Sequence, residues 1–335
     1  MKKIVFAILT LLALISLSGI LTYRTVQGPS QNREWTTLQI PNGASAKKIG
    51  LILKKNGLIS HQRLFTWWVK LTQTELKAGW YDIPPKTSIA GLVELFTSGK
   101  NAVRKVTIPE GRASWEMPAY FRKAFPEFDS TKWEILVHDS AFAKELGVKA
   151  PNLEGYLLPE TYAVPYGSSE KNIASLMVKA NLALESECEE RDSPIWKELG
   201  SWHRVLTLAS IVEEETGKTD ERALIAGVFL NRLRQGIPLG ADPTVRFIYR
   251  NLTGPIYKSQ LDSDSPYNTR KFKGLMPGPI SNPGKKAIEA ALFPQNTDAL
   301  YFVAKDDGSG THFFSKSLKD HDKFRLKAAE NRGER

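Results

Sequence analysis

Twenty consecutive residues near the start of the chain carry no charge, and this run limits where the rest of the protein can fold. It extends from Ile4 to Tyr23, follows Lys2 and Lys3, and ends at Arg24. About 20 mostly apolar residues are enough to cross the hydrocarbon core of a bilayer as a helix. The two preceding lysines favour an N-terminus in the cytoplasm and a body on the other side of the membrane.

A cleaved signal peptide and a buried core helix are the two other interpretations of this run. A signal peptide ends in a small-x-small cleavage site, and neither a clean site of that kind nor a lipobox cysteine follows the run. A core helix is disfavoured by the terminal position and by the polar segment that comes next. We therefore expect an uncleaved anchor over residues 1–24 and a linker over residues 25–34.

The chain is basic, with 46 Lys and Arg against 36 Asp and Glu and a net charge of +10. Such a balance suits nucleic acid, an anionic membrane surface or an anionic polymer. No RNP signature, paired Cys/His finger or heptad zipper accompanies it, so we expect no nucleic-acid partner. The single cysteine, Cys188, excludes an intrachain disulfide, and its acidic neighbours would raise a thiol pKa rather than activate it.

Motifs that hold a metal or a phosphate are missing from the sequence. The five histidines form no HExxH and no ligand pair, and there is no complete phosphate loop. The nucleophile elbow G-x-S-x-G is also missing. We therefore expect no metal site and no cofactor. His312 follows a glycine turn and could orient a substrate, although a capped histidine at the core edge explains it equally well.

Beyond the linker, the apolar pattern predicts an α+β protein in two parts, with a small module over residues 35–104 and a mixed α/β domain over residues 105–325. The module has a β-α-α-β layout that resembles LysM, a fold that binds N-acetylglucosamine polymers. A packing element without glycan contact is the alternative. The elements predicted in the module are an extended segment at 35–41, helices at 45–56 and about 61–71, an extended segment at 79–84 and a helix at 88–96.

The larger part begins with a weak internal repeat, because Ile108–Ser114 is similar to Ile40–Ser45 and both follow a β-like run. The last ten residues, 326–335, are expected to be a charged, frayed tail. Between them the pattern predicts helices within 115–150 and at 168–191, 202–216, 220–235 and 285–292, an irregular segment rich in Gly and Pro at 274–284, and an extended segment at 300–305.

One predicted helix ends in three acids, Glu213, Glu214 and Glu215, after a segment that is apolar almost all round. Acids in the last turn oppose the helix dipole. If one of them faces an apolar cleft, burial raises its pKa and makes it a proton donor suited to glycosidic bond cleavage. Spacing alone favours the alternative, a solvated helix end with Lys218 and Arg222 as partners.

Six motifs in order make the chain resemble the YceG-like family of endolytic murein transglycosylases. The resemblance extends from the anchor to about Asp320, and a LysM-like module belongs to the family pattern. The motifs are Leu153–Tyr156 with Pro159–Tyr162, Ala209–Thr216, Phe229–Leu233, Asp242–Val245, Ser265–Thr269 and Gly274–Gly284.

The resemblance implies a single-pass inner-membrane protein with a catalytic domain outside the cytoplasm. It also implies cleavage of the β-1,4 bond between N-acetylmuramic acid and N-acetylglucosamine within nascent peptidoglycan strands, which leaves 1,6-anhydro ends and stops strand elongation. The catalytic acid of the family falls on Glu213. Family members often have Lys or Arg at the next position, where this chain has Glu214, and this third acid could raise the pKa of Glu213 further.

Contacts to the sugar are expected from motif residues that carry carboxylate, amide, hydroxyl or aromatic groups. Peptidoglycan synthases are possible partners that the family resemblance suggests. The rival functions are a non-catalytic glycan-binding scaffold of the envelope and a hydrolytic muramidase, which would need a second carboxylate near Glu213. The candidate substrate-binding residues are Glu154, Tyr156, Glu160, Ser210, Asp242, Thr244, Tyr267, Asn268 and Thr269.

Overall fold

The computed structural model describes residues 2–250 and 252–333 of the chain. These residues form two compact units, of which the first runs up to Arg104 and includes 163–167, while the second comprises 105–162 and the chain from Ser168 onward. The chain passes between the units within the paired strands β3 (Val103–Thr107) and β4 (Thr161–Pro165). Helices and short strands both occur in the described residues, with helices predominating, which agrees with the mixed α/β composition that the sequence predicts.

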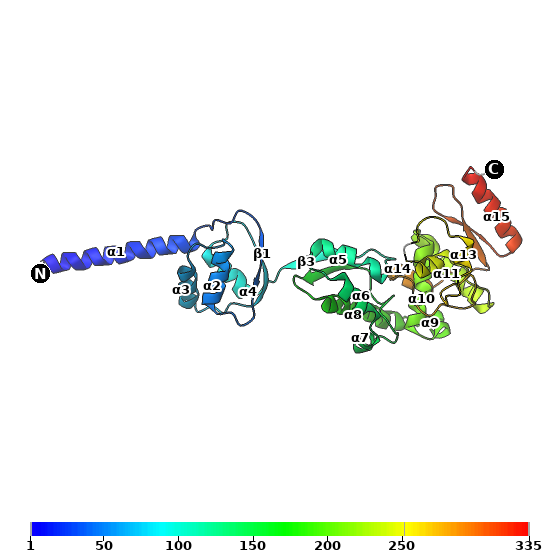
Figure 1. Ribbon diagram of the computed structural model, residues 1–335, viewed down its shortest axis with the longest axis horizontal. Coiled ribbons are helices and arrows are strands. Elements are labelled where there is room, and N and C mark those ends of the chain that lie inside the picture. The colour runs from blue at the N-terminus through cyan, green and yellow to red at the C-terminus, as the bar shows by residue number, and fades with distance from the viewer. Residues whose placement is uncertain (1, 251, 334–335) are drawn as a thin grey trace. The chain divides into compact units, whose positions relative to one another are not determined.

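Helix α1 (Lys2–Gln27) is the one helix in the described part of the chain that is long and apolar enough to cross a membrane (Figure 1). A signal sequence would have the same length and composition. The helix continues three residues beyond Arg24, so residues 25–27 are helical rather than part of a linker. The reason is that Val26 is completely buried in the apolar core of the first unit.

In the first unit, strands β1 (Thr36–Ile40) and β2 (Gly79–Ile83) pair in antiparallel fashion, with Leu38 opposite Tyr81. Ser45 and Ser88 cap helices α2 and α4 by accepting backbone N–H groups, which explains where these helices begin. The predicted elements of this unit are confirmed, while its resemblance to LysM stays a prediction. Its helices are α2 (Ala46–Lys55), α3 (Gln62–Thr72) and α4 (Ile89–Ser98).

The second unit begins with a cluster of short helices around aromatic side chains. Phe121 stacks on Phe128 at 5.0 Å, and both rings contact the buried Trp133. The Trp133 indole N–H donates to the Ser114 carbonyl at 2.9 Å, which fixes the segment after β3. The helices are the 3-10 turn η1 (Ser114–Glu116), α5 (Pro118–Ala124), α6 (Ser130–His138), α7 (Ser140–Glu145) and the long α8 (Glu170–Glu189).

Three helices that pack on one another form the centre of this unit (Figure 1). The middle one, α10, is buried from Val205 to Val212, as its apolar sequence predicts. Gly227 lets α11 approach the chain closely, because a Cβ there would lie 2.4 Å from the Gln295 carbonyl oxygen. The helices are α10 (Trp202–Glu215), α11 (Thr219–Arg234) and α14 (Lys285–Leu292), with α9 (Pro194–Leu199) beside α10 and α14.

The C-terminal part contains elements that the sequence pattern did not reveal. Residues 326–331 continue a helix, so the expectation of a frayed tail is wrong there. Ala328 is 1% exposed because the helix packs on the last two strands. The elements are α12 (Asp242–Ile248), α13 (Lys258–Leu261), the antiparallel pair β5 (Tyr301–Ala304) and β6 (His312–Ser315), and α15 (Leu318–Asn331).

The burial of Val26 predicts that the end of α1 contributes to the stability of the first unit. Val26→Asp should place an unpaired charge in an apolar core, at a cost of about 3 kcal/mol or more, and lower the melting temperature of this unit by on the order of 10 °C. The measurement is scanning calorimetry of the full chain in detergent. Thr25→Asp is the matched control, because Thr25 is exposed; equal effects of the two variants would contradict the prediction.

Candidate active site

Helix α10 ends in three consecutive acids whose side chains point in different directions. Successive residues of a helix are about 100° apart, which directs neighbouring side chains to different sides of the helix. Glu213 faces Gly284 and Arg222, whereas Glu214 faces Gly111. Glu215 lines a pocket on another side of the helix. The three acids therefore occupy three different electrostatic environments.

Glu213 is the acid with the most specific contacts. Its side chain is 5% exposed. Oε1 accepts a hydrogen bond of 2.5 Å from Nη2 of Arg222, and Oε2 accepts one of 2.9 Å from the backbone N–H of Gly284. Burial raises the pKa of Glu213, and the nearby Glu110 carboxylate raises it further, whereas the Gly284 N–H and the Arg222 guanidinium oppose the rise.

Arg222 lies between two carboxylates of very different exposure. It is supplied by the first turns of α11, and its side chain is 7% exposed. Nη1 lies 3.6 Å from Oε2 of Glu110, whose side chain is 44% exposed. The Arg222 Nε has no hydrogen-bond partner although it is buried. The guanidinium can therefore interact with Glu110 at the surface or with Glu213 in the interior.

The other two acids are shifted by their surroundings. Protein atoms around the carboxyl of Glu214 raise its pKa to about 7, an effect strengthened by Glu213 and opposed by Ser281 and Arg112. Glu214 is nevertheless exposed, so water screens its charge and weakens these shifts. Burial raises the pKa of Glu215 to about 8. Glu215 lines a pocket of about 570 Å³ together with residues of the β5–β6 region, among them His312.

The N–H group that binds Glu213 belongs to the irregular segment 274–284, which is fastened to the rest of the unit by polar side chains. The buried hydroxyl of Ser210, on α10, accepts the N–H of Ile280 at 3.1 Å. Asn282 is completely buried; its amide N–H₂ donates to Oε1 of Glu154 at 2.8 Å, and its carbonyl oxygen accepts the N–H of Leu157 at 2.9 Å. These bonds fix the backbone two residues before Gly284.

Glu154 is a buried carboxylate whose oxygens are occupied by protein donors. Besides the bond from Asn282, Glu154 accepts two hydrogen bonds from Ser114. The backbone N–H of Ser114 donates at 3.1 Å, and the Ser114 hydroxyl donates at 2.7 Å. Burial raises its pKa to about 7, while the Ser114 bonds oppose the rise. In this structure Glu154 joins the segment after β3 to segment 274–284.

Around α12, hydroxyl and amide groups hold the backbone rather than face solvent. Thr244 and Thr269 are buried, and their hydroxyls lie 2.9 Å apart. Asn268 donates to the carbonyls of Leu261 and Ser263. Asp242, at the start of α12, forms an ion pair with Arg270.

A row of aromatic side chains lies beside this region. The rings of Trp115 and Phe247 are 5.2 Å apart, and those of Phe247 and Tyr267 are 4.9 Å apart. The Arg250 guanidinium lies 4.5 Å from the centre of the Trp115 ring. Aromatic faces of this kind suit the apolar faces of sugar rings.

A family model and individual relatives of the chain agree on its family. It matches the YceG-like family over residues 38–327. The chain belongs to this family. Membership confirms the family that the six motifs indicated.

Two curated relatives of the YceG-like chain carry the same description. An endolytic murein transglycosylase of Bacillus subtilis strain 168 is 33% identical over 316 residues, which cover 89% of this chain and 86% of that protein. An endolytic murein transglycosylase of Streptococcus pneumoniae strain D39 is 31% identical over 96% of this chain, which spans 64% of that longer protein. A crystal structure of a YceG-like protein from Listeria monocytogenes is 33% identical, with a TM-score of 0.60, and covers 87% of this chain and 99% of its own.

The residues predicted to bind substrate do not converge on Glu213 as a single set. Ser210 and Glu154 reach it indirectly, through segment 274–284. Tyr156 is 2% exposed and its hydroxyl lies 3.3 Å from Nδ1 of His203, whereas Glu160 is exposed and pairs with Lys285. The buried members, whose polar groups contact protein atoms, are Glu154, Tyr156, Ser210, Thr244, Asn268 and Thr269.

Sequence reasoning missed the residues that contact Glu213 or fix its partners. Arg222 was considered only as the partner of a solvated acid; it is the partner, but the pair is buried. Glu110 and Gly284 flank the site, and Asn282 lies within segment 274–284, which the sequence predicts only to be irregular. The spacing from Glu213 to Arg222, nine residues across a helix–helix turn, was the one local signal available.

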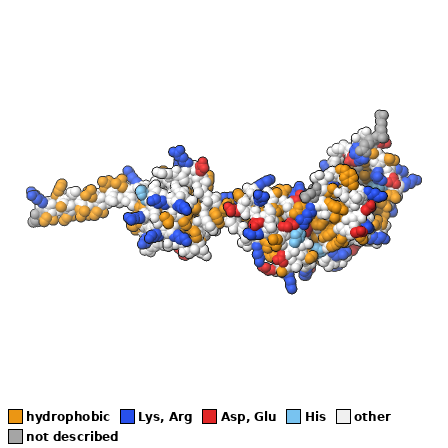
Figure 2. Space-filling view, in the orientation of Figure 1, with side chains coloured by type: hydrophobic (Ala, Val, Ile, Leu, Met, Phe, Trp, Pro, Cys, Tyr) orange, Lys and Arg blue, Asp and Glu red, His pale blue; other side chains and the backbone are white. Residues whose placement is uncertain are grey.

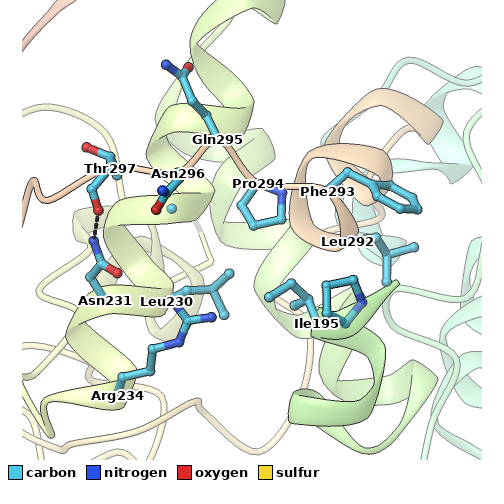
Figure 3. A pocket seen from close by; sticks show the side chains of 12 residues that line it. Ile195, Leu230, Asn231, Arg234, Leu292, Phe293, Pro294, Gln295, Asn296 and Thr297 are labelled. Carbon is cyan, nitrogen blue, oxygen red and sulfur yellow. Dashed lines mark hydrogen bonds between the residues drawn. The ribbon is translucent and has the colours of Figure 1, made fainter. Parts of the chain in front are cut away.

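Figure 3 shows a second cavity, formed between α9, α11 and the chain after α14. Its volume is about 300 Å³, and Arg234 is its one charged lining residue. Leu230 and Leu292 supply apolar walls. A cavity without a carboxyl group offers no proton donor, so it is a poor candidate for glycosidic bond cleavage.

The raised pKa of Glu215 predicts a stability that depends on pH. The folded state holds the proton more tightly than the unfolded state, so this contribution is complete below the ordinary glutamate pKa and is lost as the pH rises through about 8. Glu215→Gln should therefore raise the melting temperature at pH 8.5 and leave it nearly unchanged at pH 4.5. Thermal unfolding across this range checks it, with the exposed Glu289→Gln as control; parallel curves for both variants would contradict the prediction.

Proposed function

We propose that the protein is a membrane-anchored lytic transglycosylase that cleaves peptidoglycan strands internally, with Glu213 as its acid. The bond is the β-1,4 linkage between N-acetylmuramic acid and N-acetylglucosamine in nascent strands, and the product is a 1,6-anhydro end that stops elongation. The observation that carries the proposal is a buried carboxyl group of raised pKa in a member of a family whose curated relatives are endolytic murein transglycosylases.

Glu213 acts first as an acid and then as a base. It donates its proton to the glycosidic oxygen as the bond to the muramic acid C1 breaks. The C6 hydroxyl of the same sugar then attacks C1, and Glu213 takes the proton of that hydroxyl. One proton is given and one is recovered, so the carboxyl returns to its starting state. The attacking hydroxyl is already part of the substrate and gains from proximity, so no protein nucleophile is needed.

Arg222 controls when Glu213 carries its proton. In contact with Glu213 the guanidinium stabilises the carboxylate, which is the form that accepts the hydroxyl proton. A shift of the guanidinium toward Glu110, 3.6 Å away, frees Oε1 of Glu213 to carry a proton. The Gly284 N–H holds the other oxygen in both states, which keeps the carboxyl oriented.

A hydrolytic muramidase is the first alternative, and it requires a second carboxylate that binds water. Among the predicted substrate-binding residues, Glu154 and Glu160 are the two glutamates considered for that role. The oxygens of Glu154 are occupied by protein donors and Glu160 pairs with Lys285, so both of these carboxylates already have protein partners.

A non-catalytic scaffold that binds glycan through the first unit is the second alternative. The observation in its favour is a pocket of about 550 Å³ between the loop after β1 and the loop before β2, lined by Asn42 and Glu75 among others. A LysM-like module could use such a pocket to hold the strand that the second unit cleaves, so glycan binding there is compatible with the enzyme.

Helix α1 is proposed to remain as an anchor in the inner membrane, with the N-terminus in the cytoplasm and both units outside it. Lys2 and Lys3 before the apolar run support this orientation. A place beside peptidoglycan synthases follows from action on nascent strands, and it stays a prediction.

Glu213→Gln should remove the reaction with almost no change in side-chain shape, although its single carbonyl oxygen can accept only one of the two bonds from Arg222 and Gly284. Loss of a general acid–base group should lower the rate by roughly 100- to 10,000-fold. The measurement is mass spectrometry of muropeptides released from purified peptidoglycan, with Glu289→Gln as control. Anhydro ends from the wild type and the control alone support the proposal. Reducing ends would indicate a muramidase, and equal activity of Glu213→Gln would place the acid elsewhere.

Opposite shifts of the pH profile should distinguish the two neighbours of Glu213. Activity requires the protonated acid at the start, so its alkaline limb follows the pKa of Glu213. Glu110→Gln removes a charge that raises this pKa and should move the limb to lower pH. Arg222→Gln removes a charge that lowers it and should move the limb to higher pH.

The pH dependence of the release rate checks both shifts. Asp298→Asn, which removes an exposed carboxylate paired with Lys316, is the control and should leave the profile in place. Shifts in the same direction for the Glu110 and Arg222 variants would contradict the arrangement proposed here.

A further inference from the structure

The net positive charge of the protein comes from its N-terminal third. Residues 105–335 contain 32 Lys and Arg and 32 Asp and Glu, so they are neutral overall, and the whole net charge of +10 lies in residues 1–104. Residues 35–104 alone contain 10 Lys and Arg against 3 Asp and Glu. If the positive charge served to bind the anionic substrate, it would be expected around the catalytic site in the second unit. Because it lies in the first unit instead, we look for another anionic partner of that unit.

Helices α2 and α3, which pack side by side, both expose basic and apolar side chains. Positions 47, 48, 51, 54 and 55 of α2 are exposed, as are positions 63, 67, 70 and 71 of α3, and each set has the spacing of a single helix face. Neither helix contains an acid. The α2–α3 face consists of Lys47, Lys48, Leu51, Lys54, Lys55, Arg63, Trp67, Lys70 and Leu71.

Three large apolar side chains within this face are open to solvent. Leu51 is 56% exposed, Trp67 48% and Leu71 57%. Exposed tryptophan and leucine among lysines are typical of helices that lie in the interface of a bilayer. There the aromatic ring sits at the level of the headgroups, and the lysine stems extend their charges toward water and phosphate.

The end of α1 holds this face close to the membrane. Ile4–Tyr23, at about 1.5 Å per residue, spans about the 30 Å of a hydrocarbon core. Val26, three residues beyond Tyr23, is already buried in the first unit, and α1 contacts α3. No flexible linker separates the membrane span from the first unit, because α1 is continuous from one to the other. Helix α3 therefore lies within reach of the headgroup layer. Figure 2 shows the hydrophobic side chains along α1 and the Lys and Arg side chains on the adjoining part of the same unit.

We propose that the α2–α3 face binds the anionic lipid headgroups of the membrane in which α1 is inserted. The cations contact the lipid phosphates, and Trp67 and Leu71 enter the interface between headgroups and acyl chains. The first unit is thereby held flat on the membrane in one orientation rather than swivelling on α1. This inference rests on the anchoring role given to α1 in the proposed function, and it is independent of the reaction at Glu213.

The test uses the full chain in vesicles, with a fluorophore on a single cysteine. Cys188→Ser provides the background, Leu71→Cys carries the label on the α2–α3 face, and Gln39→Cys carries it on an exposed position of β1. Vesicles consist of phosphatidylcholine alone or of equal parts phosphatidylcholine and phosphatidylglycerol, and a nitroxide on a lipid headgroup serves as quencher. Co-flotation with the vesicles first verifies the insertion of α1.

Quenching at position 71 should be strong in the anionic vesicles and weak in phosphatidylcholine, with position 39 unquenched in both. Each cation should change the ratio of docked to undocked protein by about fivefold. Changing Lys47, Lys48, Lys54 and Lys55 to glutamine, or adding about 1 M salt, should therefore abolish the difference between lipids. The same change at four exposed lysines of the second unit should have no effect. These control residues are Lys132, Lys144, Lys149 and Lys179.

Several results would overturn the inference. One is equal quenching at positions 71 and 39 in anionic vesicles. Another is equal quenching at position 71 in both kinds of vesicle, because that result needs only tethering by α1. A third is a four-lysine variant that docks normally but no longer binds isolated peptidoglycan, which would assign the face to the wall polymer. Failure to float would reject the anchor and this inference together, while muropeptide release from the same preparation reports separately on the enzyme.

Discussion

The buried pair between Glu213 and Arg222 is the interaction on which the arrangement of the second unit depends. A carboxylate at the end of an apolar helix loses its hydration, and an unpaired one would destabilise the fold by several kcal/mol. Two donors offset this loss: the guanidinium at 2.5 Å and the Gly284 N–H at 2.9 Å. One comes from α11 and the other from segment 274–284, so both must be placed accurately before the helix end can be buried.

Placing the Gly284 N–H requires a second buried carboxylate. Segment 274–284 has no regular structure to hold it, so side chains take over that role. Ser210 binds its middle, while Asn282 binds Glu154 and two backbone groups. Removing one member of such a network leaves the others buried without hydrogen-bond partners. Each polar group left in this way destabilises the fold by about 1–3 kcal/mol. The network therefore fixes the position of Glu213 through contacts that never touch it.

Local patterns in the sequence revealed the parts of this design that are local. The apolar run of α10 with its three terminal acids and the serine caps of α2 and α4 could be recognised within a window of about 15 residues, whereas the choice of Glu213 among the three acids came from the family resemblance. The bond between Glu154 and Asn282 joins positions 128 residues apart, and no pattern indicates such a pairing. The same limit explains why Glu154, Thr244 and Asn268 were assigned to substrate: motif residues with polar side chains look alike whether they bind a ligand or hold a loop. The helical tail at Ala328 was missed because its packing partners, β5 and β6, are short.

Three acids at the end of one helix are also less unfavourable than the sequence suggests. Burial raises the pKa of Glu215 to about 8, which favours its protonated form near neutral pH, and the charge of Glu213 is balanced by Arg222. Glu214 is exposed, so water screens its charge. The C-terminus of α10 then carries far less than three negative charges, so the opposition to the helix dipole is small. Burial creates this situation, because it raises the pKa values of the same groups whose full charge the helix end could not hold. A carboxyl cluster of this kind keeps protons in the interior at the pH where the enzyme is proposed to donate one.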